Sequence, residues 1–156
     1  MRELPTRKAP RQPAHDYSRD SIYFVTLCTM NRSCILGDVT NEGRMVLSPI
    51  GETAAETLSE IPNHSQAVRL YDYVVMPNHV HMLLGMETGG IYPAPTMTDI
   101  RLVIGMYKAA VSRKLGFSIW QRSFHDHVVR SYDDFKRISE YIRRNPEKWR
   151  EDRFWQ

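Results

Sequence analysis

The order of segments along the chain predicts an α+β fold, in which an antiparallel sheet carries its helices on one face. Segments rich in β-branched and aromatic residues alternate with segments whose apolar residues recur at helical spacing, in the order β-α-β-β-α-β-α. The length of 156 residues suits one domain. We therefore expect a single domain over residues 17–156, preceded by a flexible basic arm over 1–16 that is rich in proline.

The first strand and the first helix lie in the N-terminal half of the chain. Residues 22–29 are β-branched and aromatic and long enough for a central strand. A mainly polar connection over 31–43 follows, with a short turn at 37–38. The first helix then opens at Ser48 and Pro49 and stops at Pro62.

Two strands joined by a short turn come next, at 67–76 and 80–85. Residues 88–95 are rich in glycine and proline and have no periodicity, which indicates a loop. The second helix is expected to begin with Thr98 as its capping residue and to end at Gly116.

The C-terminal part supplies a short fourth strand at 128–129 and a last helix. That helix begins at Asp133 and Asp134, whose charges suit the positive end of the helix dipole, and it ends at Pro146. The complete order of elements is that of a ferredoxin-like layout.

Composition excludes several classes of protein. No run of roughly 18 apolar residues exists, so we expect no membrane-spanning helix. The first residues lack the apolar stretch of a secretory signal. Cys28 and Cys34 form no C-x-x-C pair, which fits a reducing cytoplasm. The net charge of +3 leans toward an anionic partner.

Two histidines at 79 and 81 form the sharpest local pattern. Side chains alternate along a strand, so His79 and His81 project from one face while Val80 enters the core. Two neutral imidazoles side by side can form half of a metal site. Alternatively, they are two polar residues on a solvent face.

A second H-x-H pattern occurs at His125 and His127. All four histidines could meet at one zinc ion. A packing or substrate-contact role for the second pair is the alternative, given its aromatic neighbours Phe124 and Trp120.

The last helix carries Tyr141 and Asn145 four residues apart, and therefore on one face, with Arg137 one turn earlier. From the pattern alone, Tyr141 is a residue at the edge of the core and Asn145 a residue at the end of the helix. Tyr107 on the preceding helix is a second candidate hydroxyl, although its spacing indicates a core residue.

Taken together, the motifs resemble those of the REP-associated tyrosine transposases, relatives of the single-strand insertion-sequence transposases in the HUH endonuclease superfamily. The matching stretches run in family order, at 17–32, 74–81, 119–130 and 141–149. The resemblance implies one HUH-type domain over 17–156.

The resemblance also implies roles for four residues. His79 and His81 match the histidine pair that binds a divalent metal, Mg²⁺ or Mn²⁺. Tyr141 matches the nucleophilic tyrosine, and Asn145 matches the amide residue that completes the metal site. The insertion-sequence relatives usually carry glutamine where this chain has Asn145.

The activity implied is cutting and rejoining of single-stranded DNA through a 5′-phosphotyrosine intermediate. The implied partner is hairpin DNA of the kind found in repetitive extragenic palindromes, bound by a monomer or a homodimer. Side chains that could contact this DNA carry positive charge or can stack on bases. They are Trp120, Arg122, Arg130, Arg143, Arg144 and, in the arm, Arg7, Lys8 and Arg11.

Three alternatives remain open at the level of sequence. The first is a domesticated protein that binds hairpin DNA without turnover. The second is a zinc site built from both H-x-H pairs. The third, a ferredoxin-like RNA-binding domain, gives no reason for the histidine pair.

Overall fold

The computed structural model describes residues 21–64, 67–87 and 99–151. Within them, a sheet of four strands has the order β4-β5-β1-β6, and every neighbouring pair is antiparallel. These strands are β1 (Ser21–Cys28), β4 (Val68–Met76), β5 (His79–Met86) and β6 (His125–Val129). The first and third of them in chain order lie at the centre of the sheet, as in the expected ferredoxin-like layout. The α+β prediction is confirmed.

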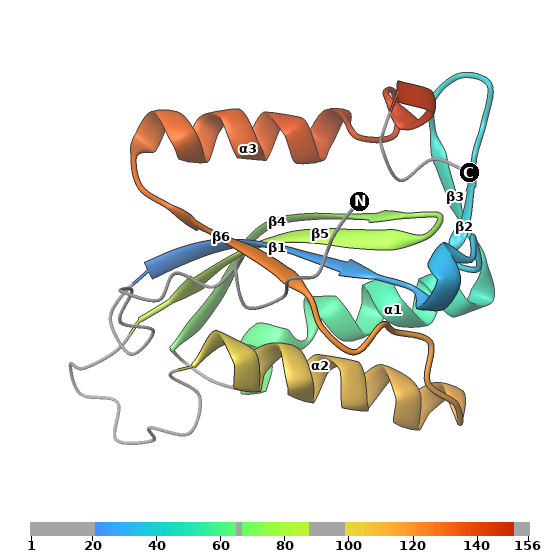
Figure 1. Cartoon of the computed structure of the whole chain (residues 1–156), viewed down its shortest axis with the longest axis horizontal. Helices are drawn as coiled ribbons and strands as arrows, with labels where there is room; N and C mark the ends of the chain where they lie inside the picture. The colour runs from blue at the N-terminus through green and yellow to red at the C-terminus, as the bar shows by residue number, and fades with distance from the viewer. Residues whose placement is uncertain (1–20, 65–66, 88–98, 152–156) are drawn as a thin grey trace.

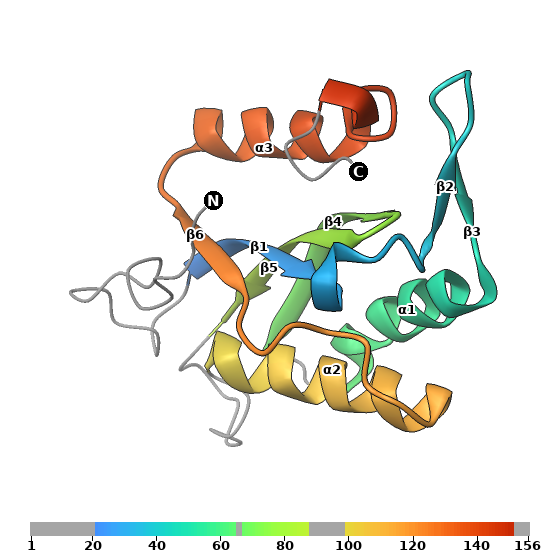
Figure 2. The ribbon, with the colours of Figure 1, turned by 45° about the vertical axis from the view of Figure 1, so that its right-hand side comes forward.

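The helices cover both faces of this sheet, which corrects the expectation that they share one face. Helices α1 (Pro49–Ser59) and α2 (Ile100–Leu115) lie on one side, and α3 (Tyr132–Arg144) lies on the other (Figures 1 and 2). The cause is visible in β5, where all eight residues are buried. A strand whose residues are buried on both faces needs a cover on each of them.

Alternate residues of the strands point to opposite faces of the sheet, and each face has its own hydrophobic core. On the first face, β1 contributes Tyr23, Val25 and Leu27 to a cluster shared with α1 and α2. On the second face, Leu83 of β5 packs against Ile138 and Ile142 of α3. The second cluster fixes α3 against the sheet.

A small hairpin lies between β1 and α1, where the sequence indicated only a polar connection with a turn at 37–38. Its strands are β2 (Gly37–Val39) and β3 (Met45–Leu47), so residues 37 and 38 are strand and the chain reverses at 40–43. A Cβ at Gly37 would lie 2.2 Å from the carbonyl oxygen of Val46, so this glycine allows a close strand approach. Gly43 has a φ of +81°, a left-handed conformation that glycine adopts readily in a turn.

Within 21–64, 67–87 and 99–151, the remaining elements are three short 3₁₀ helices, η1 (Met30–Arg32), η2 (Ile61–His64) and η4 (Trp149–Glu151). Helix α1 has the expected cap, Ser48, whose side chain accepts from the Gly51 amide. Helix α2 is capped by Asp99, not by Thr98, and ends at the left-handed Gly116 as expected. Thr98, the loop at 88–95 and the arm over 1–16 lie outside the described residues.

Among the described residues, no helix combines the length and apolar character needed to cross a membrane.

Tyr107 and Tyr141 are expected to differ in their contribution to stability. The Tyr107 hydroxyl is buried and donates to the Ala54 carbonyl at 2.8 Å, whereas the Tyr141 side chain is 46% exposed. Removing a buried hydrogen bond costs about 1 kcal/mol, so Tyr107→Phe should lower the free energy of unfolding by about that amount in a urea titration. Tyr141→Phe should change it by less than about 0.5 kcal/mol; an equal loss in both variants would contradict the assignment.

Candidate active site

His79 and His81 lie on the sheet face that α3 covers. The register pairs His79 with Cys28 and His81 with Thr26, both on the central strand β1. The two imidazole centroids are 4.6 Å apart, and the residues are only 0% and 2% exposed. The pair is therefore buried, and the alternative that His79 and His81 are polar residues on a solvent face is wrong.

Each imidazole is oriented by a hydrogen bond at Nδ1. His79 Nδ1 lies 2.8 Å from Asn78 Oδ1, and His81 Nδ1 lies 2.8 Å from Thr26 Oγ1. Because Nδ1 is engaged on both rings, Nε2 is the nitrogen that would ligate a metal ion.

Helix α3 places Tyr141 beside this pair. The helix begins after Ser131, whose side chain accepts from the Asp134 amide, and its buried Ile138 and Ile142 rest on the sheet. The Tyr141 ring then lies 5.4 Å from the His81 ring, centroid to centroid. With nearly half of its surface exposed, Tyr141 touches the histidine pair and is still accessible from outside.

Asn145, at the end of α3, is 2% exposed and brings a polar group into the same region. Its Nδ2 donates to the Tyr141 carbonyl at 3.3 Å. Its Oδ1 is buried and accepts no hydrogen bond from the described residues. Since an unsatisfied buried oxygen is costly, a cation at this point would account for it. An amide oxygen and two imidazoles are together a donor set that fits a divalent ion.

Trp149 is the site residue to which sequence reasoning gave no role. Its ring lies 6.1 Å from the His79 ring at an interplanar angle of 29°, and it packs with Cys28, Met76 and Val39. Val39 belongs to β2, so the small hairpin supports the turn that holds Trp149. The signal available in the sequence was an aromatic residue four positions after Asn145.

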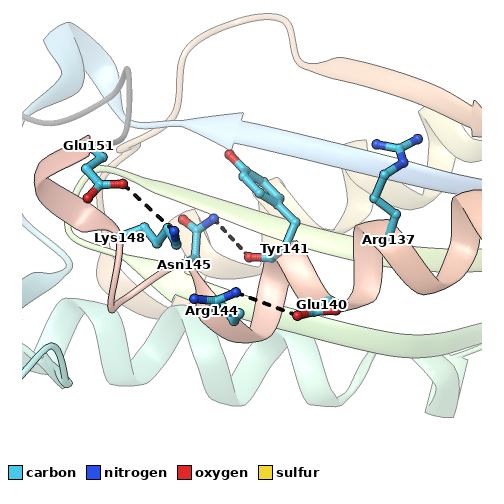
Figure 3. A pocket seen from close by; sticks show the side chains of 7 residues that line it. All are labelled: Arg137, Glu140, Tyr141, Arg144, Asn145, Lys148 and Glu151. Atoms are coloured by element: carbon cyan, nitrogen blue, oxygen red, sulfur yellow. Dashed lines mark hydrogen bonds and ion pairs between the residues drawn. The ribbon is translucent and has the colours of Figure 1, made fainter.

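A cavity of about 430 Å³ opens beside Tyr141, along the C-terminal part of α3 and the turn after it (Figure 3). Its lining is mostly charged and consists of Arg137, Glu140, Tyr141, Arg144, Asn145, Lys148 and Glu151. Three of these residues are basic and two are acidic, and Arg144 and Lys148 lie 3.7 and 3.9 Å from Glu140 and Glu151, so the lining carries a small positive excess beside the tyrosine.

The four basic residues that were expected to contact DNA and that the structure describes are all exposed, but they lie at different places. Arg144 lines the cavity, within 3.7 Å of both Glu140 and Glu147. Arg143 contacts Asp72 at 3.3 Å.

Arg130 follows β6 and donates its amide to Asp134. Arg122 lies in the segment before β6, where Lys108 binds its carbonyl oxygen. Neither residue lines the cavity.

Trp120 cannot serve as the stacking platform suggested by the sequence. It is 5% exposed and belongs to the core on the α1 and α2 face, with its ring 5.9 Å from that of Tyr107. An aromatic ring must be exposed to stack on a base, and the Trp120 ring is covered by other core side chains.

The second H-x-H pair does not join the first. His127 Nε2 lies 3.0 Å from Asp134 Oδ2 at the start of α3. His125 lies across Thr26 from His81 in the strand register, with β1 between the two histidines. Among the described residues, no group of three or more histidine, cysteine or acidic side chains could hold a metal ion. The four-histidine zinc site is therefore contradicted.

Tyr107 is a core residue, as its spacing indicated. Burial raises the pKa of its hydroxyl, and the nearby Tyr73 adds to the rise. A buried phenol that is harder to ionise is a poor nucleophile, which leaves Tyr141 as the candidate.

Comparison with known proteins identifies one curated relative. It is an uncharacterized protein of Haemophilus influenzae, 28% identical over 168 residues, and the match covers 96% of this chain and 93% of that protein. No protein-family model matches the chain.

Solved structures share the fold. One is a REP-associated tyrosine transposase bound to a REP hairpin, with a TM-score of 0.67 and 20% identity over 88% of this chain and 73% of that one. Another is a candidate transposase of Deinococcus radiodurans R1, with a TM-score of 0.51 and 19% identity over 85% and 95% of the two chains. These likenesses confirm the fold that the sequence resemblance implied.

Asn145→Leu tests whether the buried Oδ1 atom is retained for binding rather than for stability. Leucine has a similar size and removes an unsatisfied acceptor, so the free energy of unfolding should rise by about 1 kcal/mol. Thermal unfolding with and without Mn²⁺ should show that any stabilisation by the cation is lost in the variant. A variant that is destabilised yet still stabilised by Mn²⁺ would show that Asn145 is structural.

Asp134→Asn tests the contact that holds His127 at the start of α3. The hydrogen bond with His127 holds the pKa of Asp134 below its usual range, and Arg137 lowers it further. A carboxyl group with a lowered pKa stabilises the fold above its unfolded-state pKa and loses that effect as the pH falls.

Because His127 and Arg137 are largely exposed, the variant should lose only about 0.5 kcal/mol at neutral pH. The difference from the wild type should shrink as the pH falls below the ordinary aspartate pKa of about 3.9. Denaturant titrations at neutral pH and in that acid range measure it, and a loss that grows toward acid would contradict the sign.

Proposed function

We propose that this protein is a metal-dependent single-stranded DNA endonuclease and strand transferase that acts on hairpin DNA through a 5′-phosphotyrosine intermediate. The observation that carries the proposal is the placement of Tyr141, which is exposed to the cavity while its ring lies 5.4 Å from that of His81. The candidate nucleophile, Tyr141, and the histidine pair that would bind a metal thus lie close together in one chain.

His79, His81 and Asn145 would hold the divalent ion, Mg²⁺ or Mn²⁺. All three ligands are neutral, so the full charge of the ion would face the scissile phosphate. When bound, the ion supplies Lewis-acid stabilisation of the charge on the phosphate oxygens and on the departing oxygen. The buried Oδ1 of Asn145 supports this ligand set.

Tyr141 carries out the covalent step. Its phenolic oxygen attacks the phosphorus atom in line, the bond from phosphorus to the 3′ oxygen breaks, and the electron pair leaves with that oxygen. The phenol loses a proton and the 3′ oxygen gains one, which gives a 5′-phosphotyrosine and a free 3′ hydroxyl.

The 3′ hydroxyl of another strand can reverse this step. It attacks the same phosphorus and releases the tyrosine, so rejoining needs no nucleotide cofactor.

Two observations support hairpin DNA as the partner. The chain shares its fold with a transposase whose structure contains a REP hairpin. Arg137, Arg144 and Lys148 line the cavity beside Tyr141, where they would contact phosphates of the strand being cut. Arg143 lies on the same helix, while Arg122 and Arg130 would contact DNA outside the cavity.

Formation of a covalent adduct tests the proposal directly. Labelled single-stranded hairpin DNA from the source genome is incubated with the full chain and Mn²⁺ or Mg²⁺, then separated on a denaturing SDS gel. The wild type should give a metal-dependent protein–DNA band. Tyr141→Phe should give none, because phenylalanine has no nucleophile, and His79→Ala should reduce the band at least about 100-fold, since one metal ligand is lost.

Tyr107→Phe is the matched control, because it removes a tyrosine hydroxyl outside the site and should keep the band. An adduct in Tyr141→Phe would show that the nucleophile is wrong. Tight hairpin binding by the wild type without any adduct would favour a DNA-binding protein without turnover.

A further inference from the structure

We propose that Asn78 is a positioning residue that holds the His79 imidazole in the tautomer with a proton on Nδ1 and the lone pair on Nε2. The inference deepens the proposed function, since it concerns the ligand His79. It rests on the hydrogen bonds around one fully buried side chain.

Asn78 bridges two groups whose chemistry fixes its orientation. Its Nδ2 lies 3.3 Å from the backbone carbonyl oxygen of Arg32, and its Oδ1 lies 2.8 Å from His79 Nδ1. A carbonyl oxygen only accepts, so the amide NH₂ must face Arg32 and the amide oxygen must face His79. The reverse orientation would place two oxygens against each other.

The tautomer of His79 follows from that orientation. The amide oxygen of Asn78 can only accept, so Nδ1 of His79 must be the donor and carry the proton. A neutral imidazole has one N–H group, and its lone pair is then on Nε2, where a metal ion would bind.

Thr26 does not constrain His81 in the same way. A hydroxyl group can donate or accept, so the 2.8 Å contact between Thr26 Oγ1 and His81 Nδ1 fits either tautomer. Of the two histidines, His79 is the one whose tautomer is fixed by its Nδ1 partner, Asn78.

The turn that Asn78 contacts is itself held in place. Asn31 and Arg32 have φ values of 56° and 53°, a region that residues other than glycine rarely adopt. The Thr29 amide donates to the Asn78 carbonyl at 3.0 Å, and the Thr29 hydroxyl donates to the Ser33 carbonyl at 2.8 Å, across the turn. The Arg32 carbonyl is therefore a fixed reference for the Asn78 side chain.

Nitrogen-15 NMR of the imidazole rings in the metal-free full chain tests the proposal. At about pH 8, where an unperturbed imidazole is neutral, the wild type should show His79 with its proton on Nδ1. His79→Gln identifies the signals. Asn78→Leu removes the acceptor, so the spectrum should show the Nε2–H tautomer, and Mn²⁺ affinity measured by calorimetry should fall about 10- to 100-fold.

Asn78→Asp keeps an acceptor beside Nδ1 but places an oxygen where the NH₂ group faces the Arg32 carbonyl, so it should retain the wild-type tautomer at a cost in stability. Asn63→Leu, at an exposed asparagine, should change neither measurement. An Nε2–H tautomer in the wild type would overturn the proposal, as would an Asn78→Leu variant with both the tautomer and the Mn²⁺ affinity unchanged.

The two proposals can fail separately. A wild type that shows the Nδ1–H tautomer but binds no Mn²⁺ would contradict the metal site and leave the role of Asn78 in orienting His79 intact. If Asn78→Leu does not fold, the tautomers in the wild type and in Asn78→Asp decide the question.

Discussion

The burial of β5 on both of its faces is the constraint on which the rest of the structure depends. One face of the strand packs into the core with α1 and α2, and the other carries His79, His81 and Leu83. Because the second face also needs a cover, α3 lies across it through Ile138 and Ile142. The packing that buries this face also places Tyr141 beside His81, with Asn145 one turn further along α3. Stability and site assembly therefore depend on the same contact.

The site itself holds polar atoms where the fold alone would favour apolar ones. Asn145 Oδ1 is buried without a hydrogen bond from the described residues, and the two imidazoles lie under a helix rather than in water. Such groups cost free energy unless a partner compensates them. Buried groups of this kind mark positions at which a chain departs from its most stable packing.

Supporting elements hold the site residues in place from three directions. The turn at 29–32 fixes Asn78 and, through it, the His79 ring. The β2–β3 hairpin packs Val39 with Trp149, which lies against the other side of the same ring. Asp134 keeps His127 at the start of α3 and away from the first histidine pair. Residues distant in sequence thus determine how each histidine is oriented and which side chain it contacts.

The sequence by itself determined the α+β class, the order of the main elements and the shared face of His79 and His81, because periodicity and capping are local properties. The resemblance of its motifs also indicated Tyr141 and Asn145. Only the tertiary structure decided that α3 covers the opposite face, that Trp120 is buried and Trp149 lies against His79, and that His127 pairs with Asp134. It also revealed the β2–β3 hairpin, where Gly37 permits a close approach that no periodicity signals. These outcomes depend on which surfaces meet across the sheet, and long-range packing of that kind has no local pattern in the chain.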